Sequence, residues 1–170
     1  MKHAYTFIII GALFTAWHFK IHNIDLLNTA VGYLLILLGI TYVDKSRPIP
    51  EFLQARFLAT TMVIFELVTP MLPKHEFFDF LLSVFEVAIP VLLYFCLIKA
   101  DYIWCPSSRT RKYLYRFSVI GLSYIIIFLL TYVAQQLAIL LILITSLYYT
   151  FLFYVLIQLR QLADMKGEKV

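Results

Sequence analysis

Long apolar runs separated by short polar segments make up most of the chain. Six such runs fall at about residues 4–21, 26–43, 52–72, 77–98, 117–134 and 137–159. Each run has roughly the 17–25 residues that a helix needs to cross the hydrocarbon core of a bilayer. The pattern therefore predicts an all-α fold, with residues 1–170 forming a single bundle of six transmembrane helices.

The composition supports the same class of protein. Hydrophobic residues make up 62% of the 170-residue chain, whereas soluble domains are about half apolar. The first apolar run lacks the small-residue cleavage site of a secretory signal, so we expect it to remain as a span. The lipid bilayer is therefore the first expected partner. The net charge of +4 requires no nucleic-acid partner, because it is explained by the polar segments that border the spans.

The distribution of lysine and arginine predicts the orientation. If the amino terminus is cytoplasmic, twelve of the 14 basic residues lie on the inner side, and only Lys20 and Lys74 lie outside. Cytoplasmic segments of membrane proteins carry an excess of lysine and arginine. We therefore expect a multi-pass protein of the cell membrane with both termini in the cytoplasm.

The motif Phe-Glu-x-x-x-Pro occurs twice inside apolar runs, at residues 65–70 and 85–90. A proline in a helix has no N–H for the carbonyl four residues earlier, and here that carbonyl belongs to the glutamate. Each copy would thus place a carboxylate beside a freed backbone oxygen. Ionisable residues inside a membrane are costly and often functional. The candidate ligand-binding residues of the two copies are Glu66, Pro70, Glu86 and Pro90.

Helical spacing predicts which way the two acids face. Glu66 falls on one helix face with Ala55, Ala59 and Met62, and the small side chains of the two alanines favour close helix packing. In the next run a polar stripe recurs at intervals of four, three and four residues: Asp79, Ser83, Glu86 and Pro90. Two neighbouring carboxylates share a proton or hold a cation. The alternative is that both are protonated and hydrogen-bonded, with prolines that only kink the helices.

Residues 99–116 contain five basic residues and one acid, and we expect them to form a long cytoplasmic loop. This loop is either a docking site for a protein partner or for anionic lipid, or an ordinary segment that sets the topology. The candidate docking residues are Arg109, Arg111, Lys112 and Arg116.

Metal and enzyme chemistry have little support in the sequence. His18 and His22 are four residues apart, a spacing that suits Zn²⁺ on one helix face, but no further ligand motif accompanies them. No catalytic motif of the common hydrolase or nucleotide-binding types is present. We therefore expect no cofactor and no enzyme activity.

Two resemblances bear on function. Residues 19–27, followed by the span at 31–40, resemble uncharacterised small membrane proteins of Firmicute bacteria, in which an Ile-Asp-x-Leu turn leads into a Gly-Tyr-Ile-Leu-Ile span. That resemblance implies no activity. Six spans in about 170 residues also look like the substrate-binding subunits of energy-coupling-factor vitamin transporters, and Ala12 and Ala16 echo their Ala-x-x-x-Ala docking face.

Three classes of function remain open. The first is a subunit that binds or transports a cation or a small solute at the acidic centre. The second is an accessory or scaffold subunit that docks a membrane or cytoplasmic protein through residues 99–116. The third is an intramembrane enzyme.

Overall fold

The computed structural model describes residues 2–16, 25–72 and 76–167, and these form six α-helices and two short 3₁₀ turns, with no strand among them. The all-α prediction is confirmed. The helices are α1 (Lys2–Ala16), α2 (Asp25–Ser46), α3 (Pro50–Val68), α4 (Glu76–Trp104), α5 (Ser108–Val133) and α6 (Ala138–Gly167). The turns are η1 (Thr69–Met71) after α3 and η2 (Gln135–Leu137) before α6.

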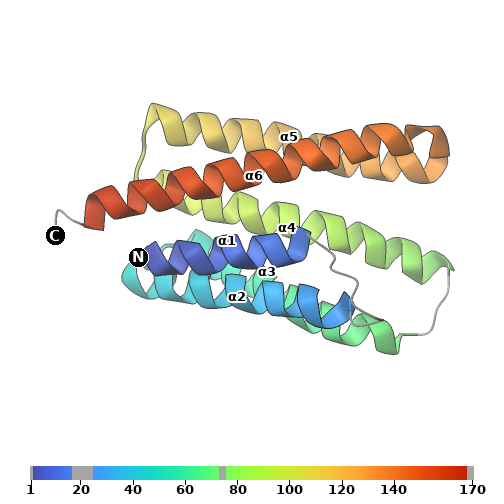
Figure 1. Cartoon of the computed structure of the whole chain (residues 1–170), viewed down its shortest axis with the longest axis horizontal. Helices are drawn as coiled ribbons and strands as arrows, with labels where there is room; N and C mark the ends of the chain where they lie inside the picture. Colours follow the sequence, from blue (N-terminus) through green and yellow to red (C-terminus); the bar gives the residue numbers. More distant parts are fainter. Residues whose placement is uncertain (1, 17–24, 73–75, 168–170) are drawn as a thin grey trace.

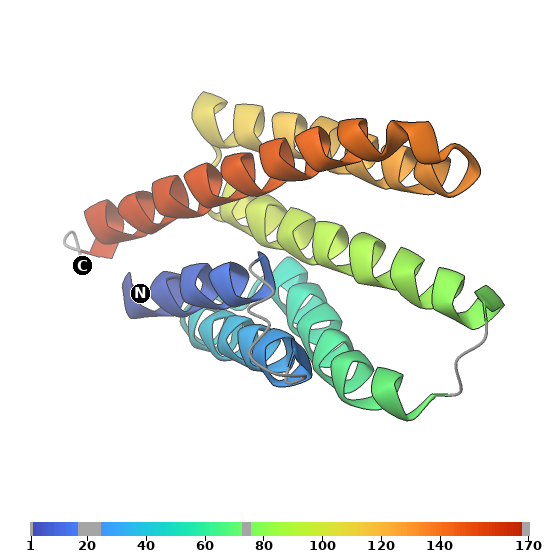
Figure 2. The same cartoon turned by 45° about the vertical axis from the view of Figure 1, so that its right-hand side comes forward.

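The helices run up and down in sequence (Figure 1). Each helix packs against the next one in the chain, and α6 packs against α1, so the main contacts close a circuit. The start of α1 and the end of α6 lie at the same end of the bundle (Figures 1 and 2), together with the end of α4. We call this end, which contains Ser46 and Trp104, the termini end.

Among the residues that the structure describes, four helices are long and apolar enough to cross a membrane. They are α3 with η1, α4, α5 and α6, and the segments that meet both criteria contain 22 to 28 residues. The described part of α1 is apolar but shorter. These dimensions are compatible with an integral membrane protein. That all six helices span the bilayer remains a prediction.

Glycines bring α1 and α2 into close contact. A Cβ atom on Gly11 would lie 2.5 Å from the carbonyl oxygen of Gly32, and a Cβ atom on Gly39 would lie 2.6 Å from that of Ala4. Only a residue without a side chain permits such an approach between two helix backbones. These glycines therefore serve the packing of α1 against α2.

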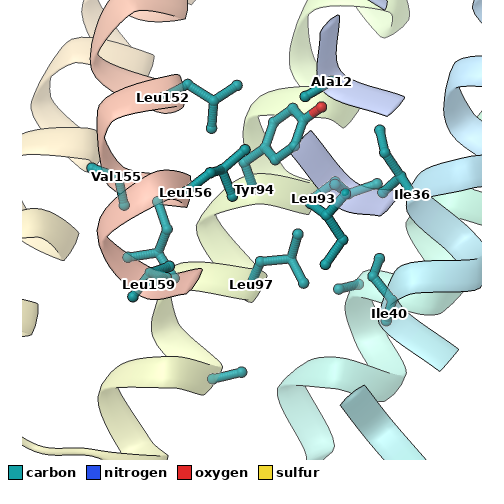
Figure 3. Packing of buried hydrophobic residues seen from close by; sticks show 14 of the residues in the cluster. Ala12, Ile36, Ile40, Leu93, Tyr94, Leu97, Leu152, Val155, Leu156 and Leu159 are labelled. Carbon is teal, nitrogen blue, oxygen red and sulfur yellow. The ribbon is translucent and has the colours of Figure 1, made fainter. Parts of the chain in front are cut away.

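Large apolar side chains fill the bundle toward the termini end. Side chains of α1, α2, α4 and α6 meet there, with the ring of Tyr94 among them (Figure 3). Ala12 of α1 is fully buried in this cluster, so it packs inside the bundle and does not belong to an external docking face. The fully buried members from the other three helices include Ile36, Ile40, Leu93 and Leu152.

The expected loop at residues 99–116 is wrong. Helix α4 continues to Trp104 and α5 begins at Ser108, so only three residues connect them. Ser107 caps α5: its hydroxyl accepts from the Thr110 N–H at 3.0 Å, and the Thr110 hydroxyl accepts from the Ser107 N–H at 3.1 Å. A helix can continue past its apolar stretch into charged residues, as α4 and α5 both do here. The capping box then sets the residue at which α5 begins.

Candidate functional site

The structure brings the two glutamates of the repeated motif together. Helix α3 buries Ala59 and Met62 completely, and Glu66 follows on the same face, half-buried. The rings of Phe65 and Phe85 meet edge to face with centroids 6.4 Å apart, which joins the two motif copies across α3 and α4. The carboxylates of Glu66 and Glu86 interact electrostatically.

The two prolines differ in their setting. Helix α3 ends at Val68, so Pro70 lies in the following 3₁₀ turn and is exposed. The prediction that Pro70 frees a carbonyl within a continuing helix is therefore wrong, because the helix has already ended. Pro90 is buried and lies inside α4, which continues to Trp104. Only the second copy of the motif places a proline within a continuous helix.

The polar stripe predicted on α4 does not act as one surface. Asp79 is exposed, and the hydroxyl of Ser83 donates to the Asp79 carbonyl at 2.8 Å within its own helix. In the described part of the chain no contact joins either residue to Glu66. Glu86 is exposed, while its neighbour Val87 is buried. Of the four stripe residues, the structure therefore associates only Glu86 with Glu66.

Buried tyrosines extend the acid pair into the bundle. Tyr33 of α2 is 3% exposed and lies within electrostatic range of Glu66 and Glu86, and of Tyr94 of α4 and Tyr149 of α6. Ionisable groups from four helices thus converge. The sequence did not single out these tyrosines, because the aromatic residues of the last apolar run surround their helix and mark no preferred face.

Tyr148 carries a hydroxyl with no hydrogen-bond partner among the residues that the structure describes. Its side chain is 1% exposed, and its ring centroid lies 5.1 Å from that of Tyr124 and 5.2 Å from that of Tyr149. Buried hydroxyls are nearly always paired, because leaving one unpaired costs free energy. The unpaired hydroxyl is therefore expected to lower the stability of the bundle.

A second polar cluster lies at the termini end and was not foreseen as a site. The Tyr5 hydroxyl donates to a carboxylate oxygen of Asp101, and Arg47 Nη1 lies 3.9 Å from the same oxygen. The side chains of Arg47 and Asp101 are only 5% and 6% exposed. The Arg47 guanidinium also lies 3.0 Å from the centroid of the Trp104 ring. These contacts join α1, the end of α2 and the end of α4.

One signal for this cluster was present in the sequence. Val87, Val91, Tyr94 and Ile98 recur along α4 at helical spacing and are all buried. Asp101 follows three residues after Ile98, and so continues the buried face. Because residues 99–116 were interpreted as a loop, the prediction did not extend the buried helix face as far as Asp101.

Substituting phenylalanine for two buried tyrosines is expected to have opposite effects. Tyr148→Phe removes an unpaired hydroxyl, so the free energy of unfolding should stay the same or rise by about 1 kcal/mol. Tyr5→Phe removes a hydrogen bond to a carboxylate and should cost about 1.5–3 kcal/mol. Thermal melting of the purified protein compares the two variants. An equal loss in both would show that the Tyr148 hydroxyl has a partner.

No metal centre is found in the part of the chain that the structure describes. His18 and His22 lie outside the described residues. Among residues 2–16, 25–72 and 76–167, no group of three or more His, Cys, Asp or Glu side chains is placed to hold a metal ion. The cations proposed for docking are exposed in the first turns of α5: Arg109, Arg111, Lys112 and Arg116.

Comparisons with protein-family models, with curated proteins and with solved structures give no match. The class that the fold defines is an all-helical protein with four helices suited to a bilayer. Its function has to be argued from the two polar clusters and the surface.

Proposed function

We propose that this is an integral membrane protein that binds a cation or a small cationic solute at Glu66 and Glu86, as a binding or transport subunit. The observation that carries the proposal is that these two carboxylates come from the adjacent helices α3 and α4 and lie near enough for the charge of Glu86 to act on Glu66, with the buried Tyr33 in electrostatic range of both.

A cation is the ligand that this pair accommodates best. Two neighbouring carboxylates repel each other when both are ionised, and a bound proton or cation removes that repulsion. The buried tyrosines beside them add neutral oxygen atoms and aromatic faces, and both kinds of group attract cations. The negative charge of the two carboxylates and the tyrosines near them therefore both favour a cationic ligand.

The burial of the pair favours access from the surface of the bundle. Glu86 is exposed and Glu66 is half-buried, so both carboxylates lie at the surface of the bundle and not in its closed interior. The interior between α1, α2, α4 and α6 is filled by buried apolar side chains (Figure 3). This arrangement supports a binding site entered from one side, and release on the other side would require the helices to rearrange.

Neutralising both acids is expected to remove stabilisation by cations. The melting temperature of the purified full-length protein is measured with Na⁺, Mg²⁺ or choline over a range of pH. At 100 times its dissociation constant, a bound cation should stabilise the wild type by about 2.7 kcal/mol. The effect should disappear in the double variant Glu66→Gln, Glu86→Gln.

The matched control is Asp79→Asn, because Asp79 is an exposed acid of α4 outside the pair. This variant should keep the full response to the cation. The double variant should itself fold without loss of stability, since neutral side chains do not repel each other. A wild-type protein that responds to none of these cations at any pH would contradict the proposal.

The accessory or scaffold function is the second candidate, and the exposed cations at the start of α5 favour it. It predicts a protein partner that co-purifies with the wild type and is lost when Arg109, Arg111 and Lys112 are replaced by glutamine. It also predicts that cations leave the melting temperature unchanged.

A further inference from the structure

A basic pocket lies where α4 passes into α5. It has a volume of about 740 Å³ and is formed in part by Arg111, Lys112 and Arg116, together with the rings of Tyr102 and Tyr115. None of the described residues that line it is acidic. The pocket therefore combines three positive charges with two aromatic rings that carry a hydroxyl group.

The three cations are not neutralised by other parts of the described chain. The ion pairs that the structure shows involve other residues: Arg47 with Asp101, Arg56 with Asp44, and Lys99 with Glu51. Arg111, Lys112 and Arg116 are all exposed. The three side chains are neither buried nor part of the ion pairs just named. Their charges can therefore interact with a ligand outside the protein.

The position of the pocket in the fold indicates which kind of anion it binds. It lies at the end of α4 and the start of α5, both of which are long and apolar enough to span a bilayer. That is the depth at which lipid headgroups lie and at which tyrosine rings collect. Arginine and lysine on the first turns of a spanning helix extend their charged ends toward the headgroups.

We propose that this pocket binds the headgroup phosphate of an anionic phospholipid in the leaflet that α4 and α5 enter at the termini end. The phosphate contacts Arg111, Lys112 and Arg116, while Tyr102 and Tyr115 pack at the level of the headgroup and glycerol. A basic pocket between membrane helices is a known form of headgroup site. The proposal is independent of the cation site at Glu66 and Glu86.

The size of the effect follows from the three charges. A lysine or arginine near an anionic surface contributes about 1 kcal/mol, which is about fivefold in affinity. Three such residues give a preference for anionic over zwitterionic lipid of up to about 100-fold. Arg111→Gln, Lys112→Gln, Arg116→Gln should bring the preference close to one.

The preference can be measured with the tryptophan next to the pocket. The full chain carries two tryptophans, so replacing Trp17 by phenylalanine leaves Trp104 as the reporter. The protein is reconstituted in phosphatidylcholine vesicles that contain brominated phosphatidylglycerol or brominated phosphatidylcholine. Quenching of Trp104 fluorescence by each lipid then gives the ratio of their affinities.

The control triple variant removes the same charge elsewhere: Lys45→Gln, Arg109→Gln, Arg160→Gln. None of these residues lines the pocket. The proposal is supported if the pocket variant loses the lipid preference and the control variant keeps it. The charge-conserving double variant Arg111→Lys, Arg116→Lys should also keep the preference. Equal loss in both triple variants would show a general charge effect and overturn it.

Two further results would also overturn the proposal. Displacement of the anionic lipid by millimolar inorganic phosphate would assign the pocket to a soluble phosphate compound. Equal quenching by both lipids, together with binding of a poly-glutamate peptide that is lost in the pocket variant, would assign it to an acidic protein segment.

Discussion

Replacing Arg47 by methionine is expected to lower the free energy of unfolding by about 3–5 kcal/mol. The substitution leaves the carboxylate of Asp101, whose side chain is 6% exposed, buried without its cationic neighbour. It also removes the guanidinium from the face of Trp104, where it lies 3.0 Å from the ring centroid. Loss of one partner from a buried ion pair is costly because the remaining charge has left water without compensation.

The double variant Arg47→Met, Asp101→Leu separates this cause from a loss of packing. If the penalty comes from the uncompensated charge, the double variant should be more stable than Arg47→Met alone. Denaturant titration of purified protein measures each free energy of unfolding, and a double-mutant cycle gives the coupling between the two residues.

The ion pair between Arg56 and Asp44 is the matched control. Its atoms are 3.4 Å apart, closer than those of Arg47 and Asp101, but the Arg56 side chain is 42% exposed. Arg56→Met should therefore cost less than about 1 kcal/mol, because water screens an exposed pair. Equal losses in Arg47→Met and Arg56→Met would refute the role assigned to burial.

Replacing Gly11 by alanine is also expected to destabilise the bundle. The new Cβ atom would lie 2.5 Å from the Gly32 carbonyl oxygen, so α1 and α2 must move apart. Overpacking of this kind costs up to about 3 kcal/mol, of which the better helix propensity of alanine returns about 1 kcal/mol. The expected net loss is about 2 kcal/mol, measured by thermal melting.

Gly121→Ala provides the comparison for this substitution. Its new Cβ atom would lie 2.7 Å from a side-chain methyl group of Val91, which can shift, whereas a helix carbonyl cannot shift alone. The propensity gain should then balance most of the strain, and the melting temperature should change little. A loss in Gly121→Ala as large as in Gly11→Ala would contradict the importance of the backbone contact.

The candidate site was predictable only in part. Apolar spacing along α3 placed Glu66 on the face of Ala59 and Met62, because helical periodicity is a local property. Motif spacing could not show that α3 ends before Pro70, since that depends on how the chain turns after the helix. Nor could it show that Tyr33, from another helix, lies within electrostatic range of both glutamates.

The segment at residues 99–116 shows the limit of composition as a guide. Its charges indicated a loop, whereas a capping box at Ser107 and Thr110 confines the connection to three residues. The basic residues thereby gain fixed positions on α5, and a pocket forms beside them. On a helix, the distances between these arginine and lysine side chains are set by the regular backbone. On a loop the same residues would have no fixed distances from one another.

By itself, the sequence determined that the chain is helical and apolar enough for a bilayer, because the length and hydrophobicity of a run are properties of consecutive residues. Only the tertiary structure decided which polar groups meet. Tyr5 and Asp101 are 96 positions apart in the chain, yet they share a hydrogen bond at one end of the bundle. Such a contact depends on how α1, α2 and α4 pack together, and no local pattern of residues encodes that packing.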